Sequence, residues 1–173
     1  TQPAIAPASA LSAAQKGPEP DLTGVLPEND VHLIKARLLA NAALNEFIGP
    51  EIRASPTSDE WGALAQAEIY VSYGEYTRAL QSMKHSGISF FTQPVAQAPD
   101  IYWHLLFPQP YWTELVANAG SNGLDPYLVA SLIRQESEFN AGAVSHANAY
   151  GLMQLLPSVG KAMAKKHDMK RFD

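Results

Sequence analysis

Hydrophobic positions recur at helical spacing along much of the chain, and the first such stretch runs from about residue 30 to residue 48. Asn29 or Asp30 can accept hydrogen bonds from the free amides at the helix start, and Gly49-Pro50 is typical of a helix end. The pattern therefore predicts one long helix. Its buried face is predicted from five apolar residues: Val31, Ile34, Leu38, Leu44 and Phe47.

Two further helices are predicted at 58–74 and at 75–83. The first carries an apolar set: Trp61, Leu64, Ala65, Ile69 and Tyr70. The pair resembles one helical hairpin of the tetratricopeptide type, in which small side chains let the helices approach and a glycine allows the reversal. The resemblance is carried by Ala67, Tyr70, Gly74, Tyr76, Ala79 and Leu80. Because such hairpins need about three repeats to cover their apolar faces, this one is expected to pack on further helices or on the next domain.

Prolines interrupt the helical pattern in two places. Residues 1–27 are rich in Ala, Pro, Ser and Gln, and their prolines exclude a long helix, so this segment is interpreted as a linker or as a strap along the helices. Residues 87–112 combine prolines with many aromatic residues. This composition fits packing between two domains or, alternatively, stacking on sugar rings. A helix is expected again at 111–119.

Composition narrows the classes of function. The 173 residues carry a formal net charge of -5 and no cysteine, and their five histidines are scattered. An acidic chain without a basic cluster is not expected to bind nucleic acid, whose phosphates require Lys and Arg. Without thiols or paired histidines, no metal site is expected, and no apolar run is long enough for a transmembrane helix.

One acid stands out in a helix expected to begin at Asp125-Pro126. The aspartate can cap free amides there, and the proline lacks an N–H that would have no partner. Glu136 lies in the last turn, on the face predicted to be buried through Leu128, Val129, Leu132 and Ile133. An acid on the core side of a helix C-terminus is disfavoured as an anion. It is interpreted as a proton donor or, alternatively, as a buried glutamate held by a neighbouring amide or arginine.

A loop of small residues follows this helix and leads to the segment 149–157. Gln154 is a single amide in an apolar run, Gly151 lets the backbone approach a neighbour closely, and Pro157 can open the next helix. The predicted arrangement is a helix that carries an acid, a tight loop, and an apolar segment that presents one amide.

These two segments closely resemble the signature of the soluble lytic transglycosylases, lysozyme-like enzymes that cut bacterial peptidoglycan. The resemblance is carried by residues 134–140, by Ala143, Ser145 and Ala149, and by residues 151–155 with Pro157. Upstream it extends through Phe107-Pro108, Tyr111-Trp112 and residues 123–126, while Val159 stands where the family commonly has Thr.

The resemblance implies an all-α chain in which helical-repeat hairpins of the superhelix type precede the N-terminal part of a lysozyme-like domain. We therefore expect a linker at 1–27, a helical scaffold at 28–104 and a catalytic domain at 105–173. The family's domain continues to a later Tyr-Asn-Ala-Gly stretch, which this chain does not contain. The chain is accordingly interpreted as a fragment that a second chain or fragment completes.

The implied activity is that of a cofactor-free lytic transglycosylase. Glu136 would be the single acid and base that cleaves the β-1,4 bond between MurNAc and GlcNAc and forms 1,6-anhydro-MurNAc. By the same resemblance, Ser145 and Gln154 would bind substrate acetamido or hydroxyl groups, Met153 and Tyr150 would shape the cleft wall, and Ser137 would orient Glu136. The expected partner is the peptidoglycan glycan strand. The expected location is the periplasm or cell envelope, and no signal peptide pattern occurs in the chain.

Two alternatives stay open. Classical retaining and inverting glycosidases need a second carboxylate. Glu138, two positions on, points to nearly the opposite side of the helix, and Asp125 lies at the helix start. A hydrolase of the goose-lysozyme type would share the single glutamate. A non-catalytic helical fragment would bind peptidoglycan or a protein without cutting it.

Overall fold

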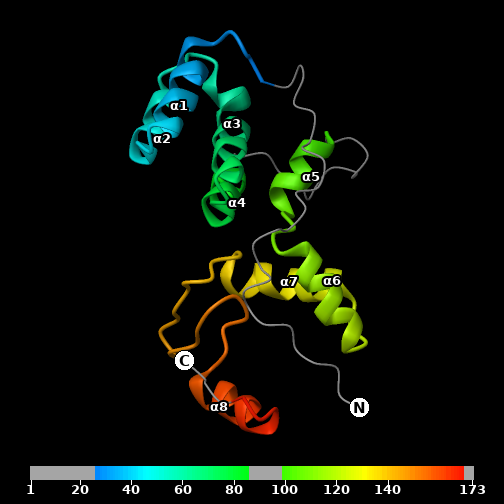
Figure 1. Ribbon diagram of the computed structural model, residues 1–173. Coiled ribbons are helices and arrows are strands. Elements are labelled where there is room, and N and C mark those ends of the chain that lie inside the picture. Colours follow the sequence, from blue (N-terminus) through cyan, green and yellow to red (C-terminus); the bar gives the residue numbers. More distant parts are fainter. Residues whose placement is uncertain (1–25, 86–98, 170–173) are drawn as a thin grey trace. The chain divides into compact units, whose positions relative to one another are not determined.

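The computed structural model describes residues 26–85 and 99–169, and the regular secondary structure of these ranges is helical, as the sequence predicts (Figure 1). The predictions for residues 1–25 and 86–98 lie outside the described residues. None of the helices in the described ranges is long and apolar enough to cross a bilayer.

The chain divides after Pro110 into two compact units, which we describe separately. The hairpin unit comprises residues 26–85 and 99–110, and the glutamate unit comprises residues 111–169. The expected start of the catalytic domain at residue 105 therefore falls inside the last helix of the hairpin unit.

Two helices replace the single long helix predicted for the first stretch. α1 (Val31–Asn41) ends in a turn in which Ala43 has a φ of 57°, and α2 (Asn45–Arg53) then continues through Gly49-Pro50 instead of ending there. The short turn lets α2 pack against α1. The prediction of a stop at Gly49-Pro50 was wrong because a proline inside a helix removes one backbone hydrogen bond, a cost that packing can offset.

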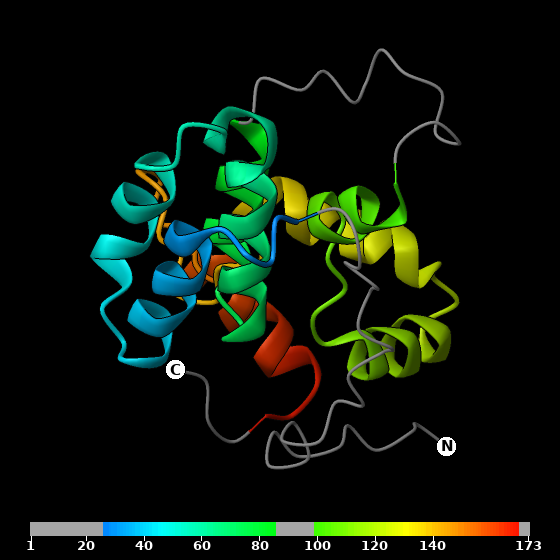
Figure 2. The same cartoon turned by 90° about the horizontal axis from the view of Figure 1, so that it is seen from above.

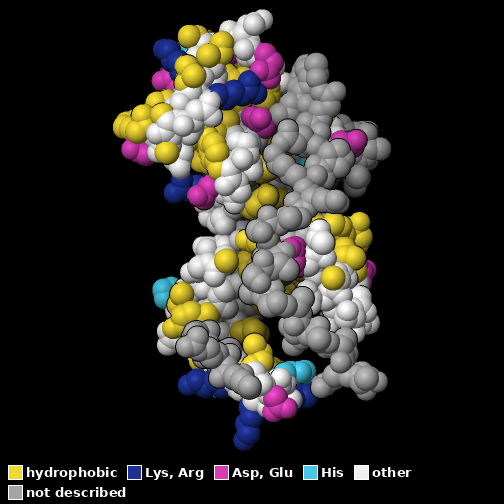
Figure 3. All heavy atoms as spheres, in the orientation of Figure 1, with side chains coloured by type: hydrophobic (Ala, Val, Ile, Leu, Met, Phe, Trp, Pro, Cys, Tyr) yellow, Lys and Arg dark blue, Asp and Glu magenta, His cyan; other side chains and the backbone are white. Residues whose placement is uncertain are grey.

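The predicted face of this stretch was also wrong. All five of its residues are exposed, and the surface over α1 and α2 shows the resulting hydrophobic side chains (Figure 3, yellow). The buried residues are instead Leu33, Ala36, Ala40, Ile48 and Ile52. Small alanines on the neighbouring stripe of α1 let other helices approach closely, whereas periodicity alone cannot tell which of two apolar stripes faces the core.

The predicted hairpin is confirmed as α3 (Ser58–Ser72) and α4 (Tyr76–Lys84). Gly74 makes the reversal with a φ of 79°, and the five apolar residues predicted for the first helix are buried. Gly62 explains why α2 approaches α3 so closely, since a Cβ at this position would lie 2.9 Å from Ile52 Cγ2. Each of α1 to α4 packs on the next helix in the chain (Figure 2).

α5 (Asp100–Leu106) completes the hairpin unit by packing on α3 and α4. It buries Ile101, Leu105 and Leu106, while Tyr102 and Trp103 are partly buried against the same core. These described aromatic residues therefore pack within the hairpin unit.

Asp30 fixes the start of α1. Its Oδ1 accepts hydrogen bonds from the amides of His32 at 2.8 Å and Leu33 at 3.2 Å, and its Oδ2 accepts one from the Ser55 hydroxyl at 2.8 Å. The bond from Ser55 is the main cause that lowers the pKa of Asp30 below its ordinary value of 3.8, and desolvation opposes it. Through the hydrogen bond from Ser55, Asp30 links α1 to the turn after α2.

We expect the stability of the hairpin unit to depend on pH through Asp30. The pKa of Asp30 is lower in the folded chain than in the unfolded chain. The stabilisation is therefore complete at a pH above the unfolded-state pKa, and it is lost as the pH falls through the folded-state pKa. Urea unfolding followed by circular dichroism across the acidic range measures this loss. Asp30→Asn should remove it, and Asp59→Asn, a change at an exposed acid of α3, should not. A pH profile unaltered by Asp30→Asn would contradict the assignment.

Candidate active site

The glutamate unit contains α6 (Trp112–Ser121), α7 (Pro126–Ser137) and α8 (Pro157–Lys166). α7 begins as the sequence predicts, with Asp125 accepting a hydrogen bond from the amide of Tyr127 at 2.8 Å and Pro126 in the first turn. α6 packs on α7, and both helices contribute buried residues: Leu115, Ala119, Ala130 and Ile133.

Glu136 does not lie on the buried face of α7. Its side chain is exposed, as are Leu128 at 64% and Leu132 at 43%, which precede it at intervals of four residues. Of the predicted face, only Ile133 is buried, together with Ala130. The prediction failed because α7 has two apolar stripes, and the stripe through Ala130 and Ile133 is the one that packs inward. The alternative interpretation of Glu136 as a buried glutamate is therefore wrong, since this residue is exposed.

The chain reverses immediately after Glu136. Glu138 and Phe139 have φ values of 51° and 63°, and Phe139 is buried at 5% exposure. Burial lowers the pKa of Arg134, and the charge of the nearby Glu138 opposes this effect. The second acid of the segment, Glu138, thus directly follows the end of α7, and its charge acts on Arg134.

The loop that follows is folded on itself, as predicted. The Asn140 side chain accepts a hydrogen bond from the amide of Gly142 at 2.9 Å, and the amide of Gly151 donates to the carbonyl of Ala143 at 2.9 Å. Tyr150 pairs with Leu155 through two backbone hydrogen bonds of 3.0 Å. The turn at Asn140 was not predicted, although an asparagine two residues before a glycine is a recognisable signal for it.

Gln154 and Ser145 hold this loop together. The Gln154 amide nitrogen donates to the carbonyls of Ala143 at 3.1 Å and Gly151 at 2.9 Å, and the backbone of Gln154 has a φ of 47°. The Ser145 hydroxyl accepts a hydrogen bond from the amide of Ala149 at 3.0 Å. Both side chains, for which the sequence predicts substrate contacts, therefore form hydrogen bonds with the backbone of the loop.

Ser137 joins the loop to the end of α7. Its hydroxyl lies 2.9 Å from the carbonyl of Leu152 and 3.2 Å from that of Ile133, and it can donate to either. Ser137, the residue next to Glu136, is thereby hydrogen-bonded to the segment that contains Tyr150 and Met153. Tyr150 is 50% exposed and Met153 is 39% exposed. The structure brings the predicted site residues into one unit, with Glu136, Tyr150 and Met153 exposed.

We expect Ser137→Ala to destabilise the glutamate unit by about 1 kcal/mol, because the Leu152 carbonyl loses a partly buried donor. Urea unfolding followed by circular dichroism measures the change. Ser131→Ala, at an exposed position of the same helix, is the matched control and should stay within about 0.5 kcal/mol of the parent. Equal effects of the two changes would show that Ser137 does not fasten the loop.

The described residues contain no group of His, Cys, Asp and Glu arranged to hold a metal ion. The site is thus a helical unit with an exposed glutamate at a helix C-terminus and a folded loop beside it.

Residues 115–173 match the family model described as the Transglycosylase SLT domain. The match shows that this segment is similar to SLT transglycosylase domains, in agreement with the resemblance noted in the sequence.

Curated relatives match shorter parts of the chain. The membrane-bound lytic murein transglycosylase C of Histophilus somni (strain 2336) is 49% identical over 39 residues, which are 22% of this chain and 11% of the relative. A putative soluble lytic murein transglycosylase of Haemophilus influenzae is 39% identical over 75 residues, which are 43% of this chain and 12% of the relative. A transglycosylase of Enterobacteria phage PRD1 is 38% identical over 53 residues, which are 31% of this chain and 20% of the relative. The chain thus spans at most a fifth of these relatives.

A solved structure with a similar fold is the lytic transglycosylase Slt of Pseudomonas aeruginosa, in an inactive mutant. It matches with a TM-score of 0.58 and 22% identity, over 84% of this chain and 22% of that chain. This match supports the all-helical fold.

Proposed function

We propose that this chain is part of a lytic transglycosylase and that Glu136 is its single acid and base. The observation that carries the proposal is the exposed Glu136 in the last turn of α7. The neighbouring Ser137 bonds to the folded loop, and both residues lie in the segment that matches the SLT domain model. The substrate is the peptidoglycan glycan strand, and the location is the periplasm or cell envelope. The murein transglycosylase names of the relatives support both assignments.

The proposed reaction consumes no water. Protonated Glu136 gives its proton to the glycosidic oxygen between MurNAc and GlcNAc, and the bond from that oxygen to the anomeric carbon breaks. The N-acetyl group of the substrate stabilises the anomeric carbon. Glu136, now a carboxylate, takes the proton of the MurNAc C6 hydroxyl, whose oxygen bonds to the anomeric carbon. The products are 1,6-anhydro-MurNAc and a free GlcNAc hydroxyl, and Glu136 is protonated again.

The position of Asp125 favours this single-acid chemistry. Asp125 caps the opposite end of α7, about 16 Å from Glu136 along the helix axis at 1.5 Å per residue. That separation exceeds the roughly 5–9.5 Å found between paired carboxylates in retaining and inverting glycosidases. Asp125 therefore does not suit the role of a nucleophile or of a base for water.

We assign substrate contacts to four further residues and a positioning role to Ser137. Tyr150 and Met153 form the wall of the cleft, and Ser137 positions Glu136 through the backbone. Because the Ser145 oxygen accepts from Ala149, its own O–H is the group that donates to a substrate oxygen. The Gln154 nitrogen bonds to the loop, so its carbonyl oxygen is the group that accepts from an acetamido N–H.

We assign a second partner to the exposed stripe of α7. Leu128 and Leu132 lie in line with Glu136 and are largely exposed. A second chain or fragment that covers this stripe would bury apolar surface and enclose the carboxylate, which strengthens electrostatic interactions with the substrate.

The mass of the products tests the reaction. Muropeptides released by the chain from purified sacculi should be lighter by one water than those released by a hydrolase. Products of hydrolytic mass would favour the goose-lysozyme alternative, which the exposed glutamate also suits. Binding to sacculi without any release, by a chain whose circular dichroism shows an intact helical fold, would favour the non-catalytic alternative.

A further inference from the structure

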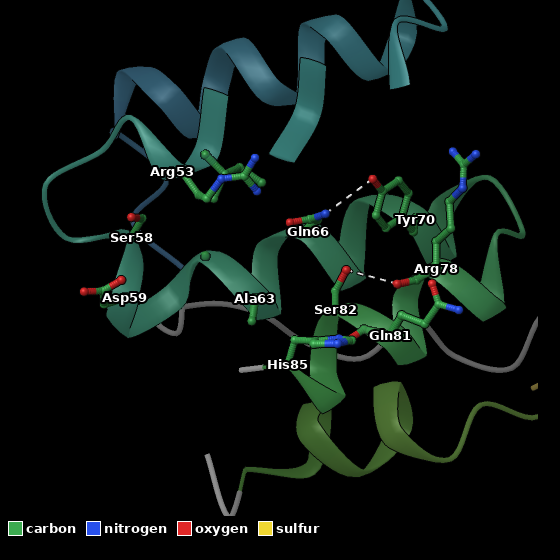
Figure 4. A pocket seen from close by; sticks show the side chains of 12 residues that line it. Arg53, Ser58, Asp59, Ala63, Gln66, Tyr70, Arg78, Gln81, Ser82 and His85 are labelled. Atoms are coloured by element: carbon green, nitrogen blue, oxygen red, sulfur yellow. Dashed lines mark hydrogen bonds between the residues drawn. The ribbon is translucent and has the colours of Figure 1, made fainter. Parts of the chain in front are cut away.

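The hairpin unit contains a groove that the proposed chemistry at Glu136 does not use. It lies among α2, α3 and α4, and Figure 4 shows the side chains that line it. Its volume of about 620 Å³ is within the roughly 300–1,000 Å³ of ligand pockets. A second hollow of about 500 Å³ continues from it along α2. The two share four residues, so we treat them as one groove: Arg53, Gln66, Tyr70 and Arg78.

Contacts connect these four shared residues across the groove. Arg53 and Gln66 both face Gly49, since a Cβ there would lie 3.1 Å from Arg53 Nη1 and 3.3 Å from Gln66 Nε2. The Gln66 amide nitrogen donates to the Tyr70 hydroxyl at 3.3 Å, and the Arg78 guanidinium lies over the Tyr70 ring at 5.9 Å from its centre. Figure 4 shows the resulting order Arg53, Gln66, Tyr70, Arg78. The middle of the groove therefore has a guanidinium group at each side and a polar floor.

The acidic and basic residues of the groove lie in different parts of it. Asp59 lines only the first hollow and Glu46 only the second, whereas both arginines line the part that the two hollows share. Arg78 has one ion-pair contact at 3.9 Å, to Glu75, and no described carboxylate forms an ion pair with Arg53. The middle of the groove thus offers two guanidinium groups to an anion, and guanidinium matches a carboxylate with two parallel hydrogen bonds.

We propose that the groove between α2, α3 and α4 binds an extended acidic peptide that lies along the two joined hollows and whose carboxylates pair with Arg53 and Arg78. This site is separate from the chemistry proposed for Glu136, so the two proposals can fail independently.

The test is a nuclear magnetic resonance titration of the chain with the acetylated and amidated peptide Gly-Glu-Gly-Glu-Gly. The Glu peptide should shift the signals of α2 and α4 and saturate, whereas the isosteric peptide with Gln in place of Glu should not. Arg53→Gln and Arg78→Gln should each weaken binding roughly tenfold, because each removes a hydrogen bond between the groove and a charged carboxylate of the peptide. Lys84→Gln removes an exposed charge of α4 outside the groove and should leave the affinity unchanged.

Gly49→Ala keeps every charge but adds a methyl group 3.1 Å from Arg53 Nη1, so it should also weaken binding. It keeps the proposal testable if an arginine variant loses helical structure. Equal binding of the Gln peptide, full affinity in both arginine variants, or the lack of a saturable shift would each overturn the proposal.

Discussion

Glu136→Gln is expected to reduce the release of muropeptides from sacculi by roughly 10²–10⁴-fold, the usual contribution of a general acid or base. Glutamine has nearly the same shape but cannot give a proton to the glycosidic oxygen or take one from the C6 hydroxyl. Because Glu136 is exposed, the change should leave the helical circular dichroism and the thermal unfolding of the chain unaltered. The rate of release, set against sedimentation binding to sacculi, separates lost chemistry from lost binding.

Glu138→Gln is the matched control for this experiment. It makes the same chemical change two residues away, beside Arg134 instead of on the exposed stripe of α7. We expect it to retain release within a few-fold of the parent, about 1 kcal/mol in barrier. If Glu138→Gln lost as much activity as Glu136→Gln, the single-acid assignment would be wrong.

Leu33→Ala is expected to destabilise the hairpin unit by about 2–5 kcal/mol, the range for a fully buried leucine. Leu33 is 0% exposed and belongs to the core to which α1 to α5 contribute, so its removal leaves a cavity. Urea unfolding followed by circular dichroism measures the loss.

Leu38→Ala is the matched control on the same helix, and it is expected to have little effect on stability. The sequence pattern predicts Leu38 on the buried face, whereas it is 61% exposed. Its truncation should therefore change the stability by no more than about 0.5 kcal/mol. A larger loss for Leu38→Ala than for Leu33→Ala would mean that the face predicted from the sequence is the buried one.

The helices with local signals could be predicted from the sequence. Asp125-Pro126 starts α7 through a side-chain hydrogen bond and a fixed φ, and Gly74 makes the reversal between α3 and α4 with a positive φ. These signals act within a few residues and need no tertiary contact. The turn between α1 and α2 has no such signal, because Ala43 takes a positive φ that its residue type does not favour.

The buried faces could be predicted only in part. α1 and α7 each carry two apolar stripes, and the stripe that packs inward is chosen by the neighbouring helices. In both helices the buried stripe contains small residues, namely Ala36 and Ala40 in α1 and Ala130 in α7, whereas longer side chains of the other stripe are exposed. A pattern of hydrophobic positions weights leucine above alanine and so points to the wrong stripe.

The candidate site could be predicted as a set of residues but not as a set of roles. The signature brought Glu136, Ser137, Ser145 and Gln154 together, and the structure places them in one unit. The hydrogen bonds of Ser137 and Gln154 to backbone carbonyls follow from the fold of the loop, which depends on contacts such as that between Gly151 and Ala143. The arginine groove of the hairpin unit had no sequence signal, because its residues come from three helices.

Water labelled with heavy oxygen tests the central proposal most directly. Sacculi are digested by the chain in this water, and the ends of the released muropeptides are examined by mass spectrometry. If Glu136 carries out the water-free reaction, the MurNAc ends are anhydro sugars without the heavy oxygen. Heavy oxygen at the anomeric carbon of those ends would contradict the proposal, because it would show that water, and not the C6 hydroxyl, attacks the bond.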